Sequence, residues 1–174
     1  PLRAFTDRYL ADAAELGVDR KDALGTHIHA DHISGVRNLD AEGVIPTAAV
    51  DRGVTYADEL VKAKDGDEFH VGDATIETVA TPGHTTGMTS YLVDESLLAP
   101  GDGLFIESVA RPDLEEGDDG APDAARMLYE SLQERVLTLP DDTLLGGAHF
   151  SEGAVPASCN LLTAATKAIG GGEG

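Results

Sequence analysis

Thr26-His27-Ile28-His29-Ala30-Asp31-His32 brings three histidines and one aspartate into a span of six residues. Alternate residues of an extended segment point the same way, so His27 and His29 can converge on one ion. Asp31 and His32 follow where the chain is expected to turn into a helix, and they can face a second ion beside the first. Imidazole and carboxylate donors suit zinc, iron or manganese, and no cysteine lies nearby. The stretch therefore predicts a metal site.

Three further candidate ligands lie in separate loops downstream, and each follows glycine closely. They occur in Pro82-Gly83-His84, Gly101-Asp102-Gly103 and Gly146-Gly147-Ala148-His149. Glycine lets the backbone bend tightly enough to aim a short side chain at one point. Any single aspartate of so acidic a chain can be an ordinary surface residue, but the clustering favours metal ligands. His70 stands alone on an expected strand and is interpreted as surface or hairpin structure.

The pattern of apolar residues and turn residues predicts strands mixed with helices. Helical spacing indicates helices over 4–16, ended by Gly17, over 33–42, ended by Gly43, and over 122–137, opened by Pro122. Strands are expected over 68–71, 74–80, 90–93, 97–99 and 143–145. Every candidate ligand then falls at a strand end or in a loop, where a rigid scaffold usually presents its chemistry.

Length and composition predict a single globular domain over residues 1–174. The chain has 174 residues, of which 41% are hydrophobic, and no apolar run approaches the length of a membrane span. No signal-peptide pattern opens the sequence. The single cysteine, Cys159, excludes an internal disulfide framework and fits a reducing compartment. We expect a cytoplasmic protein without a membrane partner.

The charge balance is strongly acidic. Thirty-two acidic residues face twelve basic ones, for a formal net charge of −20. A nucleic-acid partner is not expected, because phosphate needs a footprint of lysine and arginine. Acidic residues are dispersed through the chain and lysines are few, which favours a salt-adapted, halophilic protein whose self-repulsion is screened at high ionic strength.

The order and spacing of these blocks resemble the metallo-β-lactamase superfamily. The matching residues are His27-x-His29-x-Asp31-His32, Thr81-Pro82-Gly83-His84-Thr85-x-Gly87, Gly101-Asp102 and His149. The resemblance covers roughly residues 20 to 150 and implies an α+β, four-layer αβ/βα sandwich with the metal at one edge of two sheets. Family members normally begin with several strands, whereas this sequence starts almost at the first helix. We expect some N-terminal strands to be lacking, so that the chain is a fragment or a partner, such as a second copy in a homo-oligomer, covers the sheet edge.

Within the superfamily, the sequence is most similar to persulfide dioxygenases. The similarity rests on residues 26–35, on 101–106 and on Ala110-Arg111-Pro112-Asp113-Leu114. It implies oxidation of a glutathione-type persulfide to sulfite with O2, on one Fe(II) held by His27, His84 and Asp102. The groups left to orient ligands or handle protons are then His29, Asp31, His32 and His149, with Asp31 and His32 as catalytic candidates.

Two alternatives remain open. A glyoxalase II-like thioester hydrolase would use the same seven residues for two Zn(II) ions: His27, His29 and His84 for one, Asp31, His32 and His149 for the other, and Asp102 as a bridge. A metal-binding but non-catalytic module is the other alternative. Arg111 is a catalytic candidate that would bind a substrate carboxylate or fix the active-site loop, and a structural ion pair with Asp113 is equally open.

Overall fold

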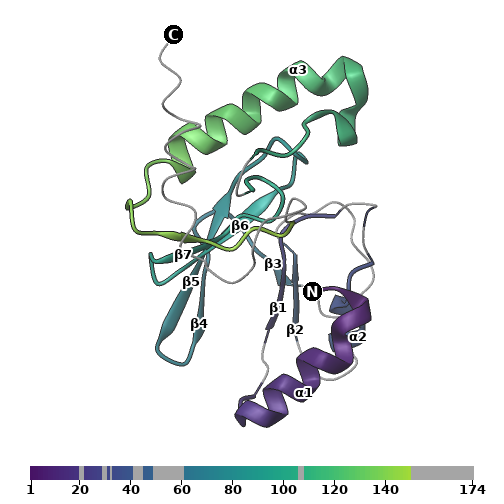
Figure 1. Cartoon of the computed structure of the whole chain (residues 1–174), viewed down its shortest axis with the longest axis vertical. Coiled ribbons are helices and arrows are strands. Elements are labelled where there is room, and N and C mark those ends of the chain that lie inside the picture. Colours follow the sequence, from purple (N-terminus) through teal and green to yellow (C-terminus); the bar gives the residue numbers. More distant parts are fainter. Residues whose placement is uncertain are drawn as a thin grey trace.

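The computed structural model describes residues 1–19, 22–28, 31, 33–40, 45–48, 61–105 and 108–149. The strands form a three-stranded sheet, in the order β1-β2-β3, and a five-stranded sheet, in the order β4-β5-β6-β7-β8. Figure 1 shows α1 and α2 beside the smaller sheet and α3 across the larger one. The expected four-layer arrangement of helices outside two sheets is confirmed.

The smaller sheet is entirely parallel. It contains β1 (Asp22–Gly25), β2 (Ile45–Ala48) and β3 (Val61–Lys62), and Leu24 pairs with Thr47. The first helical segments are the short η1 (Arg3–Phe5), α1 (Thr6–Leu16) and α2 (Val36–Asp40). Ala23, Val36 and Leu39 form a buried cluster with Tyr9 and Leu10 packed against it. This cluster joins both helices to β1.

The larger sheet is antiparallel except at one edge. Its strands are β4 (Glu68–Val71), β5 (Ala74–Ala80), β6 (Thr89–Val93), β7 (Leu97–Ala99) and β8 (Leu144–Leu145). Each of the first three pairs antiparallel with the next, whereas β8 runs parallel to β7. The strands β5, β7 and β8 therefore point the same way, and their C-terminal ends meet at one edge of the sheet.

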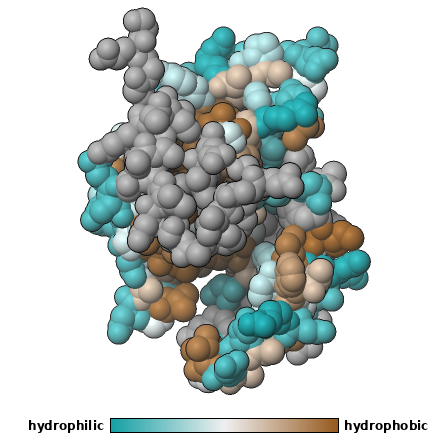
Figure 2. All heavy atoms as spheres, viewed as in Figure 1, coloured by the Kyte–Doolittle hydropathy of each residue, from teal (hydrophilic) through white to brown (hydrophobic). Residues whose placement is uncertain are grey.

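A long helical segment covers the larger sheet. It comprises α3 (Asp113–Ser131) and one π-helical stretch, η2 (Leu132–Val136). The main apolar core lies between this segment and the sheet, and consists of Val79, Leu92, Leu98, Leu104, Leu128, Leu132, Val136 and Leu145. On the face shown in Figure 2, hydrophilic residues gather over the N-terminal part of α3, which carries several acidic side chains.

Local sequence signals predicted several elements correctly. The hairpin of β4 and β5 has the expected bounds, and Gly72 in its turn has a φ of 62°. Gly17 ends α1 with a φ of 65°, and its N–H is bonded to the carbonyls of Ala13 and Ala14. Strands 90–93 and 97–99 are also confirmed, with one additional residue at the start of β6. The expected strand 143–145 is observed as Leu144–Leu145.

Two helix predictions were wrong at their starts. The helix expected from Pro122 begins at Asp113, and Gly117 interrupts it with φ 69° and ψ −173°. Pro122 therefore lies inside the part of the helix that follows Gly117, and does not open the helix.

The helix expected from residue 33 begins at Val36 instead. The N–H of Arg3 bonds to the carbonyl of Ile33, and the N–H of Gly35 bonds to that of Pro1, so these residues pair with the N-terminal segment. The expected helix end at 41–43 lies outside the described residues. Within the described part of the chain, none of the helices combines the length and the apolar character that a membrane span requires.

Candidate metal centre

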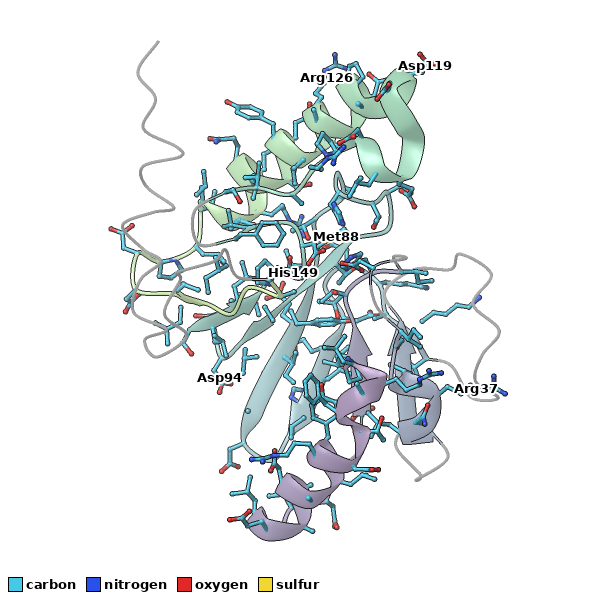
Figure 3. All side chains as sticks on the ribbon, turned by 45° about the vertical axis from the view of Figure 1, so that its right-hand side comes forward. Arg37, Met88, Asp94, Asp119, Arg126 and His149 are labelled. Atoms are coloured by element: carbon cyan, nitrogen blue, oxygen red, sulfur yellow. The ribbon has the colours of Figure 1, made fainter. Side chains whose placement is uncertain are left out.

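Four of the expected ligands lie just beyond strand ends. His27 follows β1, His84 lies between β5 and β6, Asp102 follows β7 and His149 follows β8. The last three meet because β5, β7 and β8 end at the same edge. The N–H of Thr89, at the start of β6, donates to the carbonyl of Thr26 at 2.9 Å and so brings His27 to this edge. Figure 3 shows His149 near the centre of the molecule.

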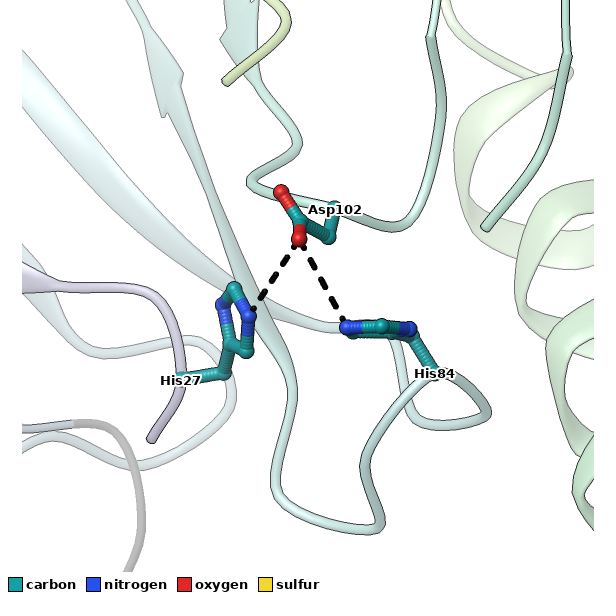
Figure 4. A group of neighbouring side chains, drawn as sticks. All are labelled: His27, His84 and Asp102. Atoms are coloured by element: carbon teal, nitrogen blue, oxygen red, sulfur yellow. Dashed lines mark ion pairs between the residues drawn. The ribbon is translucent and has the colours of Figure 1, made fainter. Parts of the chain in front are cut away.

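One oxygen of Asp102 faces two histidines. Its Oδ2 atom lies 3.6 Å from Nε2 of His27 and 3.6 Å from Nε2 of His84, as Figure 4 shows. The two imidazole rings are nearly perpendicular, at 79°, with centroids 5.1 Å apart. All three side chains are buried, with 3–5% of their surface exposed. The three groups therefore converge on one small volume shielded from solvent.

The spacing of these donor atoms fits a metal ion. At 3.6 Å the nitrogen–oxygen separations exceed the usual length of a hydrogen bond. An ion between the donors, at about 2.0–2.2 Å from each, is compatible with such separations. Two neutral imidazoles and one carboxylate also form a donor set suited to Fe(II) or Zn(II).

In each of the two buried histidines, the ring nitrogen that faces away from Asp102 contacts a neighbouring group. Nδ1 of His84 donates to the backbone carbonyl of Arg111 at 2.9 Å, and a carbonyl can only accept, so this ring carries its proton on Nδ1. Nδ1 of His27 lies 3.0 Å from Oγ1 of Thr26. In both rings Nε2 is consequently the atom that faces Asp102, as expected for metal ligands whose other nitrogen is hydrogen-bonded.

A second group of side chains extends from Asp102 towards solvent. Nδ1 of His149 donates to Oδ1 of Asp102 at 2.8 Å, and Nε2 of His149 lies 3.2 Å from Oδ2 of Asp31. The side chains of His149 and Asp31 are 52% and 37% exposed. The two carboxylates thus contact opposite nitrogens of one ring. Asp102, His149 and Asp31 thus form a chain of contacts from the buried site to the surface.

The surroundings of Asp102 keep its carboxyl group ionised. Burial alone would raise its pKa, but the interactions with His27 and His149 outweigh that effect. They lower the pKa of Asp102 to about 2 from its ordinary value of 3.8. An ionised carboxylate is the form that binds a metal ion.

Glycine is required next to two of the candidate ligands. Gly83 has a φ of 140°, and a Cβ atom there would overlap the backbone of Leu128 in α3. Gly101 has a φ of 56°, and a Cβ atom there would lie 2.8 Å from side-chain atoms of Thr26 and Met88. At these two positions the backbone beside a candidate ligand adopts a conformation that only glycine fits.

Side chains of α3 hold the loop that carries His84. The hydroxyl of Ser131 donates to the carbonyl of Pro82 at 2.7 Å, and the N–H of Thr86 donates to Oε2 of Glu115 at 2.6 Å. Neither Ser131 nor Glu115 was expected at the site from sequence. Thr26 was also missed, although its position beside His27 was a signal.

The remaining expected residues have different outcomes. His29 and His32 lie outside the described residues. His70 is exposed on β4 and contacts Glu68, which confirms its assignment to the hairpin. The guanidinium of Arg111 forms a two-point contact with Asp113, at 3.1 and 2.5 Å, so the structural ion pair is present. Its carbonyl, rather than its side chain, contacts a candidate ligand.

Comparisons with known proteins agree with this geometry. The family model described as "Metallo-beta-lactamase superfamily" matches residues 7–149. The chain is 36% identical over 141 residues to the human mitochondrial persulfide dioxygenase ETHE1, covering 80% of this chain and 52% of that protein. It is also 36% identical over 157 residues to the hydroxyacylglutathione hydrolase of Brucella anthropi, covering 85% of this chain and 56% of that protein.

A solved structure shows the same fold. The crystal structure of ETHE1 from Myxococcus xanthus superposes with a TM-score of 0.75 and 32% identity, covering 88% of this chain and 64% of that chain. The chain thus spans about half the length of the curated relatives it matches. With a family model covering most of the sequence, the chain belongs to the metallo-beta-lactamase superfamily.

Proposed function

We propose that this chain is the metal-binding domain of a persulfide dioxygenase that acts on a glutathione-type persulfide. The observation that carries the proposal is the convergence of His27 and His84 on one oxygen of Asp102. Two histidines and one carboxylate with open positions form the usual donor set of non-haem Fe(II) oxygenases. Similarity to a human persulfide dioxygenase supports the same reading.

The reaction would combine persulfide, O2 and water and release thiol, bisulfite and a proton. The sulfur–sulfur bond breaks, the outer sulfur is oxidised and O2 is reduced. When bound by His27, His84 and Asp102, Fe(II) would supply adjacent open positions where O2 and the persulfide sulfur are held together.

The chain's own residues would prepare this site. The carbonyl of Arg111 holds the ring of His84 with Nε2 towards Asp102, and burial keeps bulk water away from the donors. His149 holds one carboxylate oxygen of Asp102 and leaves the other towards the histidines. Asp31, which is exposed and lies 3.2 Å from Nε2 of His149, is suited to pass the released proton to solvent.

A two-zinc thioester hydrolase is the second candidate. Asp31, Asp102 and His149 are close enough to one another to be considered as a second group of metal ligands. Similarity to a hydroxyacylglutathione hydrolase supports this alternative. The contact of Oδ1 of Asp102 with His149, at hydrogen-bond distance, favours the single ion.

Parallel assays on purified protein separate these functions. We expect Fe(II)-loaded protein to consume O2 with glutathione persulfide and to release an equal amount of sulfite. Substitution Asp102→Ala should abolish this activity. Asp123→Ala, which removes an exposed acid paired with Arg126 on α3, is the matched control and should leave the activity unchanged.

Hydrolysis of a glutathione thioester by zinc-loaded protein, without O2 consumption, would contradict the dioxygenase. Bound metal with neither activity would indicate a non-catalytic module.

A further inference from the structure

Thr26 contacts both segments that carry buried metal-ligand candidates. Its Oγ1 atom lies 3.0 Å from Nδ1 of His27. Its side chain also borders Gly101, the residue before Asp102, so closely that a Cβ atom on Gly101 would lie 2.8 Å from Cβ and Oγ1 of Thr26. A single hydroxyl-bearing side chain therefore lies between the ring of His27 and the loop of Asp102.

The backbone of Thr26 is itself fixed. Its carbonyl accepts the N–H of Thr89 at 2.9 Å, and Thr89 is buried at the start of β6 in the larger sheet. The position of the hydroxyl is consequently set by both sheets, since Thr26 follows β1 of the smaller one. Such a fixed hydroxyl can hold an imidazole ring in one orientation.

We propose that Thr26 is a positioning residue for the metal centre, and that its hydroxyl holds His27 with Nε2 towards the ion. His84 has an equivalent partner at its own Nδ1, but that partner is the backbone carbonyl of Arg111. Groups that hold the second nitrogen of a ligating histidine contribute substantially to metal affinity. Of the two holding groups, the hydroxyl of Thr26 is the one that a side-chain substitution can remove. The proposal rests on the metal centre of the proposed function, but it does not depend on which reaction that centre catalyses.

Titration of the metal-free protein with Co(II), followed by visible absorption, tests the proposal without an activity assay. Thr26→Val keeps the branched shape beside Gly101 and removes the hydroxyl, and it should weaken Co(II) affinity by roughly 10- to 100-fold and alter the Co(II) spectrum. Thr26→Ser keeps the hydroxyl and should stay within a few-fold of wild type. Circular dichroism of each metal-free variant checks that it is folded.

Thr78→Val is the matched control. Thr78 is a buried threonine of β5 whose hydroxyl has no hydrogen-bond partner among the described residues, so its loss should not change Co(II) affinity. Wild-type affinity in folded Thr26→Val would overturn the proposal, as would equal weakening in Thr26→Ser or in Thr78→Val. Failure of the wild-type protein to bind Co(II) would overturn the metal centre itself. A dioxygenase assay that fails while Thr26→Val still weakens Co(II) binding would overturn only the proposed reaction.

Discussion

Asp102 accepts a hydrogen bond from Nδ1 of His149 through Oδ1, at 2.8 Å, while its other oxygen faces the buried histidines. The two oxygens of one carboxylate thus have different partners. This division separates a buried half of the candidate metal site from an exposed half that consists of His149 and Asp31.

Removal of His149 should raise the pKa of Asp102 in the metal-free protein. Burial works to raise that pKa, and contacts with His27 and His149 bring it down to about 2. His149→Ala removes one of these contacts, so Asp102 should titrate above 2, as measured by NMR of its labelled carboxyl carbon. Because a carboxylate with a depressed pKa stabilises the fold until the pH falls through that pKa, this contribution should be lost at a higher pH in the variant. His70→Ala, on the exposed hairpin, should leave the pKa of Asp102 in place.

Gly83→Ala should destabilise the fold much more than Gly72→Ala. At Gly83 the φ of 140° disfavours any side chain, and a Cβ atom would overlap backbone atoms of Leu128, which cannot move without shifting α3. We expect a loss of ~3 kcal/mol or more in the free energy of unfolding. Gly72 has a φ of 62° but no atoms within 4 Å of its Cβ position, so its substitution should cost only about 1 kcal/mol. Urea denaturation of both metal-free variants measures the difference, and equal losses would contradict the packing at Gly83.

Thr78→Val should stabilise the protein, whereas Thr81→Val should destabilise it. The hydroxyl of Thr78 is buried without a hydrogen-bond partner among the described residues. The hydroxyl of Thr81 is buried and lies 2.7 Å from that of Ser90. Valine at 78 removes an unsatisfied group, for a gain of about 1 kcal/mol, and valine at 81 leaves Ser90 unsatisfied, for a loss of about 1 kcal/mol or more. Thermal and urea unfolding should give opposite signs, and a loss of stability at both positions would contradict this account.

The carboxylate of Asp65 contacts the last residue of β5, and it should make the free energy of unfolding depend on pH. Burial works to raise its pKa, but the N–H of Ala80, which it accepts at 2.8 Å, and the guanidinium of Arg135 lower that pKa below 3.8. Since the folded-state pKa is depressed, the stabilisation is present above the unfolded-state pKa and is lost as the pH falls through the folded-state value.

Asp65→Asn should therefore unfold at lower urea concentration than wild type at pH 7. The difference should narrow as the pH falls below about 4, where the carboxyl of the unfolded chain takes up a proton, and should vanish below the depressed pKa of the folded state. Asp123→Asn, at an exposed position paired with Arg126, serves as the control. A difference between Asp65→Asn and wild type that stays constant from pH 7 to pH 2 would show that the charge is not responsible.

Sequence predicted those features that depend on neighbouring residues. The hairpin of β4 and β5 follows from alternation and from Gly72, which are local signals. Convergence of His27, His84 and Asp102 could be inferred only through the family resemblance, because the approach of the strand ends depends on pairing between distant segments.

Other features have no local signature. The group that holds His84 is the carbonyl of a residue 27 positions away, and every residue has such a carbonyl. Ser131 reaches the His84 loop across 49 positions, and nothing in its surroundings marks it as part of a site. The start of α3 was misplaced for a different reason: Pro122 resembles a helix start, whereas Gly117 interrupts a helix that had already begun.

The number of metal ions per chain tests the central claim most directly. Metal-free protein should be saturated anaerobically with Fe(II), freed of excess ion and analysed for iron and protein by mass spectrometry. We predict one iron per chain, because His27, His84 and Asp102 provide one buried set of donors and His149 holds the remaining oxygen of Asp102. The same count in His149→Ala would support that assignment. Two tightly bound ions per wild-type chain, with the second lost in His149→Ala, would contradict it.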